Sequence, residues 1–330
     1  MLFRILMPVS LILSYTCLQA GLGQATHRRS TTEVGKRPDG PISKFYQDSL
    51  GLRFRYVRGG WATMGVPQNR ISPPNATITE RRRHLHLRSF YICTKLITNR
   101  EFLTFVLRTG YHPVGGKIPK ALAKFYSPKF STLCKHPEHV LHKVFLRQLY
   151  DPRYRRWNRV NDPVVFVSPA DAQAFCHWLS VRDKRQYHLP TADELEYASQ
   201  LGGDSSSRPQ NRRNGWFLSN SDGYPHPVGL LRPDRLGIYD LRGDVFEMTG
   251  TRARASVLSK MSHLIVTTHS NRPTAPGPLT WAIGGCFCAP ASASRRYLRY
   301  VLVSPNLRLD WLGFRIVAAV RAKRAVNRQR

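Results

Sequence analysis

The stretch Leu236-Gly-Ile-Tyr-Asp-Leu-Arg-Gly-Asp-Val-Phe-Glu247 is the most informative part of this 330-residue chain. It places three carboxylates, Asp240, Asp244 and Glu247, within eight positions of a protein that has 20 Asp+Glu against 51 Lys+Arg. Gly243 permits a tight backbone turn between them. Carboxylate oxygens on such a turn can bind a hard cation such as Ca²⁺. The alternative is that the acids pair with Arg235 and Arg242, and the spacing leaves both interpretations open.

Upstream of this stretch, three capping signals predict three helices. They are Thr98-Asn-Arg-Glu101 with a stop at Gly110, Ser168-Pro-Ala-Asp171, and Thr191-Ala-Asp-Glu194. Two segments alternate apolar and polar residues, which predicts strands over Leu52–Val57 and His84–Phe90. Beyond Gly202 the pattern is one of turns and short strands. A fixed repeat and the βαβ alternation of a doubly wound sheet are both missing from the sequence.

The ends of the chain differ in composition from its middle. Residues 1–25 carry Arg4, an apolar stretch and then small residues, which predicts a secretory signal peptide and hence export, with an uncleaved anchor as the alternative. Residues 26–48 are predicted to be a disordered basic leader and 321–330 a basic tail. A single domain is predicted over 49–320, interrupted by a basic insertion at 115–160 that has no clear period.

The formal net charge is +31, yet 42% of the residues are hydrophobic and 11% aromatic. This composition supports a packed core and excludes a disordered polycation. The basic residues are spread over separate clusters, and an exported protein meets little nucleic acid. A solvated basic surface or an anionic envelope partner is therefore preferred to nucleic acid.

The collinear order of these motifs resembles the formylglycine-generating enzyme (sulfatase-modifying factor) family. The resemblance runs from about Leu52 to Ala319 and implies an α+β fold: a single loop-rich domain related to the C-type lectin fold. The landmarks are Met64-Gly65, Leu96–Phe102, Thr109–Tyr111, Asp162–Ser168, Asp171-Ala172, Trp178, Leu189–Ala198, Gly202-Gly203, Val228-Gly229, Leu236–Glu247, Gly284-Gly285 and Leu312–Arg315.

The resemblance implies two calcium sites. In the first, the ligands would be the side chains of Asp240 and Glu247 and the backbone carbonyls of Gly243 and Val245. The second would map to Asn214, the Gly215 carbonyl, Asp222 and the Tyr224 carbonyl.

The family's copper chemistry matches this sequence less well. Formylglycine-forming members use two cysteines after the Gly-Gly turn to bind one Cu(I), and they use O₂ to oxidise a substrate cysteine to an aldehyde. Here those two positions hold Ala289 and Ser294, and Phe246 replaces an active-site tryptophan. Cys286 and Cys288 lie nearby. As residues i and i+2 of a strand, their sulfurs could meet one metal. The alternative is two small apolar residues in a packed strand.

Removing the signal peptide would leave five of the six cysteines. Cys93 is predicted to be a strand-core residue and Cys176 a buried free thiol. Cys134, with His136, His139 and His142, is either a loose metal cluster or part of an ordinary basic surface.

Two functions follow from this reading. The first is an exported oxidoreductase with an altered copper site, acting on an extended cysteine-containing peptide or a sulfatase-like protein. The second is a catalytically inactive member that binds a peptide or a polyanion.

Overall fold

The computed structural model describes residues 45–65, 83–111, 159–203, 214–253, 265–266, 278–291 and 300–320. The predicted signal peptide, most of the leader, nearly all of the 115–160 insertion and the 321–330 tail lie outside these residues. The first strand begins at Phe45, so the folded domain starts a few residues before position 49, inside the stretch predicted as leader. Within the described part of the chain, no helix is long and apolar enough to cross a membrane.

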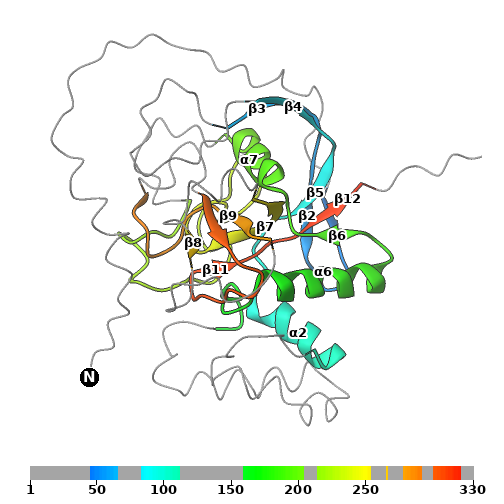
Figure 1. Ribbon diagram of the computed structural model, residues 1–330, viewed down its shortest axis with the longest axis vertical. Helices are drawn as coiled ribbons and strands as arrows, with labels where there is room; N and C mark the ends of the chain where they lie inside the picture. Colours follow the sequence, from blue (N-terminus) through cyan, green and yellow to red (C-terminus); the bar gives the residue numbers. More distant parts are fainter. Residues whose placement is uncertain are drawn as a thin grey trace, which may run out of the picture.

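The architecture combines three helices and three sheets among the described residues, which confirms the predicted α+β class (Figure 1). The helices are α2 (Asn99–Thr109), α6 (Pro169–Asp183) and α7 (Ala192–Leu201). The first sheet has the order β1 (Phe45–Gln47), β2 (Arg53–Val57), β5 (Phe90–Cys93), β12 (Val317–Ala319) and β6 (Tyr187–His188). The second has the order β11 (Leu312–Gly313), β7 (Phe246–Arg252), β9 (Thr280–Ile283), β10 (Tyr300–Val303) and β8 (Ile265–Val266). The third is a ribbon of β3 (Gly60–Met64) and β4 (Arg83–Leu87).

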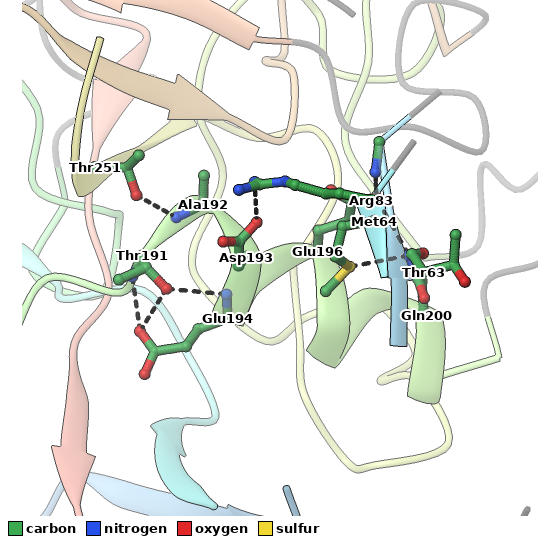
Figure 2. A network of polar contacts seen from close by, with 11 residues as sticks. Thr63, Met64, Arg83, Thr191, Ala192, Asp193, Glu194, Glu196, Gln200 and Thr251 are labelled. Atoms are coloured by element: carbon green, nitrogen blue, oxygen red, sulfur yellow. Dashed lines mark hydrogen bonds and ion pairs between the residues drawn. The ribbon is translucent and has the colours of Figure 1, made fainter. Parts of the chain in front are cut away.

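All three predicted helix starts are confirmed. Thr98, Ser168 and Thr191 each form a capping box with the acidic residue three positions later. In α7, the backbone N–H of Thr191 donates to the Glu194 carboxylate at 2.7 Å, and the backbone N–H of Glu194 donates to the Thr191 hydroxyl at 3.1 Å (Figure 2). Each box satisfies backbone donors that have no partner within the helix.

The strand prediction at Leu52–Val57 is confirmed by β2, but the single strand predicted over His84–Phe90 is wrong. The chain leaves the β3–β4 ribbon after Leu87 and enters the first sheet at Phe90, so two strands replace one. Ser89 fixes the break because its hydroxyl accepts hydrogen bonds from the Gly59 N–H at 2.9 Å and from the Tyr56 hydroxyl at 3.1 Å. A Cβ at Gly59 would lie 2.3 Å from the Leu87 carbonyl oxygen, so this crossing requires glycine.

The main core lies between the first sheet, α2 and α6, and it is rich in aromatic rings. Phe102, Phe105, Phe175 and Phe314 are all at most 3% exposed. The Phe175 ring packs against Phe314 at 5.6 Å and against Phe105 at 5.7 Å between centroids. These contacts hold the helices on the sheet that carries β12.

Helix α7 fixes the β3–β4 ribbon to the rest of the domain (Figure 2). Arg83 of β4 pairs with Asp193 at 2.6 Å, and the Gly65 N–H donates to Glu196 at 3.1 Å. The Gln200 amide also donates to the Thr63 carbonyl at 3.2 Å. The ribbon is therefore an anchored element of the fold.

Candidate functional site

Residues 240–247, which include the start of β7, are held in a tight conformation. Asp240, Gly243 and Asp244 have positive φ angles of 55°, 73° and 57°. The Gly243 N–H donates to the Gly284 carbonyl at 3.0 Å, and the Asp244 N–H donates to the Trp216 carbonyl at 2.8 Å. The loop is thus hydrogen-bonded to the 214–229 segment on one side and to the Gly284-Gly285 turn on the other.

The carboxylates of Asp240 and Asp244 accept hydrogen bonds from the same short backbone segment, residues 226–229. Asp244 Oδ1 accepts from the His226 N–H at 2.9 Å, and Asp240 Oδ2 accepts from the Gly229 N–H at 2.7 Å. Their other oxygens, Asp240 Oδ1 and Asp244 Oδ2, are buried and have no hydrogen-bond partner among the described residues. Unpartnered buried carboxylate oxygens are costly, and they call for a proton, a water or a cation.

The electrostatics of this pair follow from burial. Asp240 is 3% exposed and Asp244 is fully buried. Burial raises the pKa of Asp244 well above its usual range, and the neighbouring Asp240 carboxylate raises it further. Burial also raises the pKa of Asp240, against the lowering effect of the Gly229 hydrogen bond. A cation placed between the two carboxylates would relieve both effects.

Glu247, the third acid of the loop, is engaged by an arginine. Its two carboxylate oxygens accept from Arg315 Nε at 2.5 Å and Nη2 at 2.7 Å. Glu247 is 1% exposed and Arg315 is 0% exposed. The partner of Glu247 is therefore Arg315, and not Arg235 or Arg242, which the sequence offered as the alternative to cation binding. Arg315 also donates to the carbonyls of Cys93 at 3.2 Å and Tyr239 at 2.9 Å.

The residues of the first predicted calcium site differ in whether their oxygens are free to bind an ion. Asp240 offers one unpartnered oxygen, whereas Glu247 is bound to Arg315. Gly243 and Val245 lie on the same loop, and Val245 is fully buried. Across the described ranges, no group of three or more His, Cys, Asp or Glu side chains is arranged to hold a metal ion. Side-chain ligands would therefore have to be supplemented by backbone carbonyls or water.

The second predicted calcium set lies on the adjoining segment. Asn214 is half-buried, while Asp222 is exposed and has a φ angle of 54°. The Gly215 carbonyl accepts from the Asn220 amide at 3.2 Å, and the Tyr224 N–H donates to the Ser221 carbonyl at 3.3 Å. These contacts describe a structured turn, and calcium binding there stays a prediction.

Cys286 and Cys288 lie in a turn directly after β9, so the predicted strand is wrong at this point. The Ala289 N–H donates to the Cys286 carbonyl at 3.0 Å. The sulfurs are nevertheless brought to 2.8 Å of each other. Cys286 is 1% exposed and Cys288 is partly exposed. The hydrogen bond to Cys286 and burial both raise the pKa of Cys288.

The family's copper positions do not fit copper in this chain. Ala289 occupies the first position, is 8% exposed and carries no ligand atom. Ser294, at the second position, lies outside the described residues. Phe246, in place of the tryptophan, is buried and packs edge-on against Trp311 with 5.4 Å between ring centroids. The first family ligand is therefore replaced by an apolar core residue.

The turn that holds Cys286 and Cys288 (the thiol turn) is hydrogen-bonded to residues 240–247 (the carboxylate loop). The Phe287 N–H donates to the Asp244 carbonyl at 2.7 Å, and the Ser221 hydroxyl donates to the Phe287 carbonyl at 2.8 Å. The described residues thus bring Cys286, Cys288, Asp240 and Asp244 into one region.

Sequence reasoning missed His226. Its ring stacks on Trp216 at 3.7 Å and on Tyr224 at 4.9 Å between centroids. Its Nε2 lies 2.9 Å from the Ser221 carbonyl oxygen, and burial lowers its pKa. No spacing rule would have identified it, since its role depends on the fold of the 214–229 segment.

The predictions for Cys93 and Cys176 are confirmed. Cys93 and Cys176 are free and at most 3% exposed, and burial raises the pKa of Cys93 to about 12. The Cys134 cluster lies outside the described residues.

Comparison with known proteins identifies the family of this chain. Residues 46–320 match the model of the sulfatase-modifying factor enzyme 1-like domain. The chain is 34% identical over 129 residues to "Inactive C-alpha-formylglycine-generating enzyme 2" of Bos taurus, covering 34% of this chain and 41% of the relative. It is 29% identical to the protein of that name in Mus musculus, covering 51% and 60%. Identity to "Formylglycine-generating enzyme" of Bos taurus is 25%, covering 62% and 65%. The chain thus spans less than two thirds of each of these relatives.

Solved structures show the same fold at low identity. PvdO from Pseudomonas aeruginosa superposes with a TM-score of 0.61 at 19% identity, covering 85% of this chain and all of the other. Treponema denticola variable protein 1 gives a TM-score of 0.53 at 18% identity, covering 84% and 99%. The family match extends over most of the sequence and over nearly all of the described fold. This chain belongs to the sulfatase-modifying factor family, which includes the formylglycine-generating enzymes.

Proposed function

We propose that this chain is an exported member of its family that does not form formylglycine and instead acts as a peptide-binding module. The observation that carries the loss of formylglycine formation is the buried Ala289 at the first copper position, where no ligand atom is present. Two relatives that are named inactive formylglycine-generating enzymes support this loss. The peptide-binding part rests on membership of the family. The proposed ligand is an extended cysteine-containing peptide of the kind a sulfatase would present.

The proposal is tested with the chain lacking residues 1–25, a fluorescent sulfatase-type peptide and its Cys→Ser counterpart. We expect both peptides to bind and, after incubation with Cu(I) and O₂, no aldehyde to be detected by mass spectrometry. Aldehyde formation on the cysteine peptide would overturn the proposal. Binding that is displaced by heparin and lost at high salt would instead indicate the polyanion-binding alternative.

A second candidate function rests on the 2.8 Å approach of Cys286 and Cys288. Two thiolates are suitable ligands for Cu(I), which would supply the family's O₂-dependent oxidation of a substrate cysteine. On this reading the pair replaces the family positions from a turn slightly upstream. The two sulfurs would hold the ion, and the partly exposed Cys288 would face the substrate side.

A measurement of copper uptake distinguishes this second candidate function from the first and does not depend on catalytic activity. If the thiols hold Cu(I), a competition titration with a chromophoric Cu(I) chelator should show one tightly bound equivalent. That uptake should be abolished by Cys286→Ser and by Cys288→Ser. It should persist in Cys176→Ser, which replaces a buried free thiol of α6. Equal uptake by all three variants would argue against the site.

We also propose that a calcium ion binds at the carboxylate loop, with Asp240 as a ligand. The unpartnered buried oxygens of Asp240 and Asp244 support it. Saturating calcium at about 100 times its Kd should raise Tm by roughly 5–10 °C relative to EDTA. Asp240→Asn should abolish this increment.

The matched control is Glu247→Gln. Because Glu247 is committed to Arg315, this variant should lose stability in both buffers while keeping the calcium-dependent increment. A Tm that chelator does not move in the parent chain would rule out calcium here. An increment lost in Glu247→Gln would restore the ligand set implied by the family resemblance.

A further inference from the structure

The outer face of the β3–β4 ribbon carries a cluster of aromatic and imidazole rings that the proposed function does not use. In the ribbon, Trp61 is paired with His86 and Thr63 with His84. Ala62, Met64 and Leu87, which alternate with these residues, are buried members of the second core cluster, and Leu85 packs against it. Because side chains alternate across a strand, Trp61, Thr63, His84 and His86 share the opposite face.

The rings on this face are accessible, and the Trp61 indole contacts both imidazoles. Trp61 is 60% exposed, and both histidines are exposed. The indole stacks on the His84 ring at 5.2 Å between centroids with 7° between planes. It meets the His86 ring edge-on at 5.4 Å. The three rings therefore form one surface cluster.

His84 has the arrangement expected of a metal ligand. Its Nδ1 lies 3.3 Å from the Thr63 hydroxyl. Metal-binding histidines usually engage one ring nitrogen in such a hydrogen bond, which orients the ring and leaves the other nitrogen for the metal. His86 projects from the same face of β4 two residues later, so the two imidazoles can approach one ion.

The ribbon offers these ligands from a fixed base. Arg83, adjacent to His84, is paired with Asp193 of α7, and the backbone of Thr63 is bound by Gln200 (Figure 2). An anchored pair of strands reduces the conformational entropy lost when two side chains chelate an ion.

We propose that His84 and His86 bind a divalent transition metal ion of the zinc and nickel class, with water completing the coordination. Neutral imidazole is a favoured ligand for these ions. Thr63 is a positioning residue that orients His84. The carboxylate loop and the thiol turn take no part in this site, so it can be tested separately from the proposed function.

The test uses the full chain, Ni²⁺ as a quencher of tryptophan emission and Zn²⁺ in calorimetry. Because Trp61 touches both rings, Ni²⁺ should quench part of the emission with one-to-one saturation. Trp61→Phe should lose this quenching and still bind Zn²⁺. His84→Ala and His86→Ala should lose both signals, and Thr63→Val should weaken Zn²⁺ binding by about tenfold.

Two controls guard against metal held elsewhere. His177→Ala removes an exposed histidine of α6 and should change neither signal. A variant with His136, His139 and His142 replaced by Ala should retain the quenching of Trp61. Zn²⁺ affinity that is unchanged in both His84→Ala and His86→Ala would overturn the proposal.

Discussion

Replacing Arg315 by methionine should cost about 3–5 kcal/mol of folding free energy, because it leaves the Glu247 carboxylate buried without its partner. Glu247 and Arg315 are both almost fully buried and are joined by two hydrogen bonds. Arg315 also donates to the carbonyls of Cys93 and Tyr239, so its removal leaves further acceptors in the core without a donor. Urea denaturation followed by circular dichroism measures the loss.

The matched control is Arg83→Met, which removes the ion pair with Asp193 from a more exposed setting. The Arg83 and Asp193 side chains are 36% and 26% exposed, and a pair of this kind contributes about 0–1 kcal/mol. The double variant Arg315→Met, Glu247→Leu should recover part of the loss, since it removes the buried charge. Equal destabilisation by Arg315→Met and Arg83→Met would show that burial does not govern the Glu247 pair.

The helices could be predicted from the sequence because their signals are local. Each capping box lies within four residues, and each helix begins where its box predicts. The break between β4 and β5 could not be predicted. It depends on Gly59 and Ser89, which lie 30 positions apart and meet only in the folded chain.

In the candidate site, too, local features could be predicted from the sequence and long-range contacts could not. Sequence analysis identified Asp240, Asp244 and Glu247 as a group from their spacing. It could not identify the partner of Glu247 because Arg315 is 68 positions away, although the motif Leu312–Arg315 was already among the landmarks. It also placed Cys286 and Cys288 on a strand, whereas positive φ angles at Gly284 and Gly285 end β9 and create a turn. The closeness of the sulfurs is a property of that turn.

These contacts give the carboxylate loop a structural role that is independent of any bound ion. Through Gly284, Trp216, His226 and Phe287, the loop connects β9, the 214–229 segment and the thiol turn. A change in the backbone of this loop should therefore disturb all three parts together.

Gly243→Ala should have the second large effect, a loss of more than about 3 kcal/mol. Gly243 has a φ angle of 73°, which costs a residue with a side chain about 1–2 kcal/mol. In addition, a Cβ there would lie 2.2 Å from the Trp216 carbonyl oxygen, so the backbone of one segment would have to move. The loss should appear in urea denaturation, and if calcium binds at the loop its stabilising increment should fall as well.

Gly223→Ala provides the control that separates the two causes. Its φ angle of 82° imposes a similar conformational cost, but nothing lies within 4 Å of the Cβ position. This variant should therefore lose only about 1–2 kcal/mol. If the two alanine variants were equally stable, the contact between Gly243 and Trp216 would not be a constraint, and the loop would not couple the carboxylates to the 214–229 segment. A larger loss at Gly243 would instead tie the position of Asp240 and Asp244 to that contact.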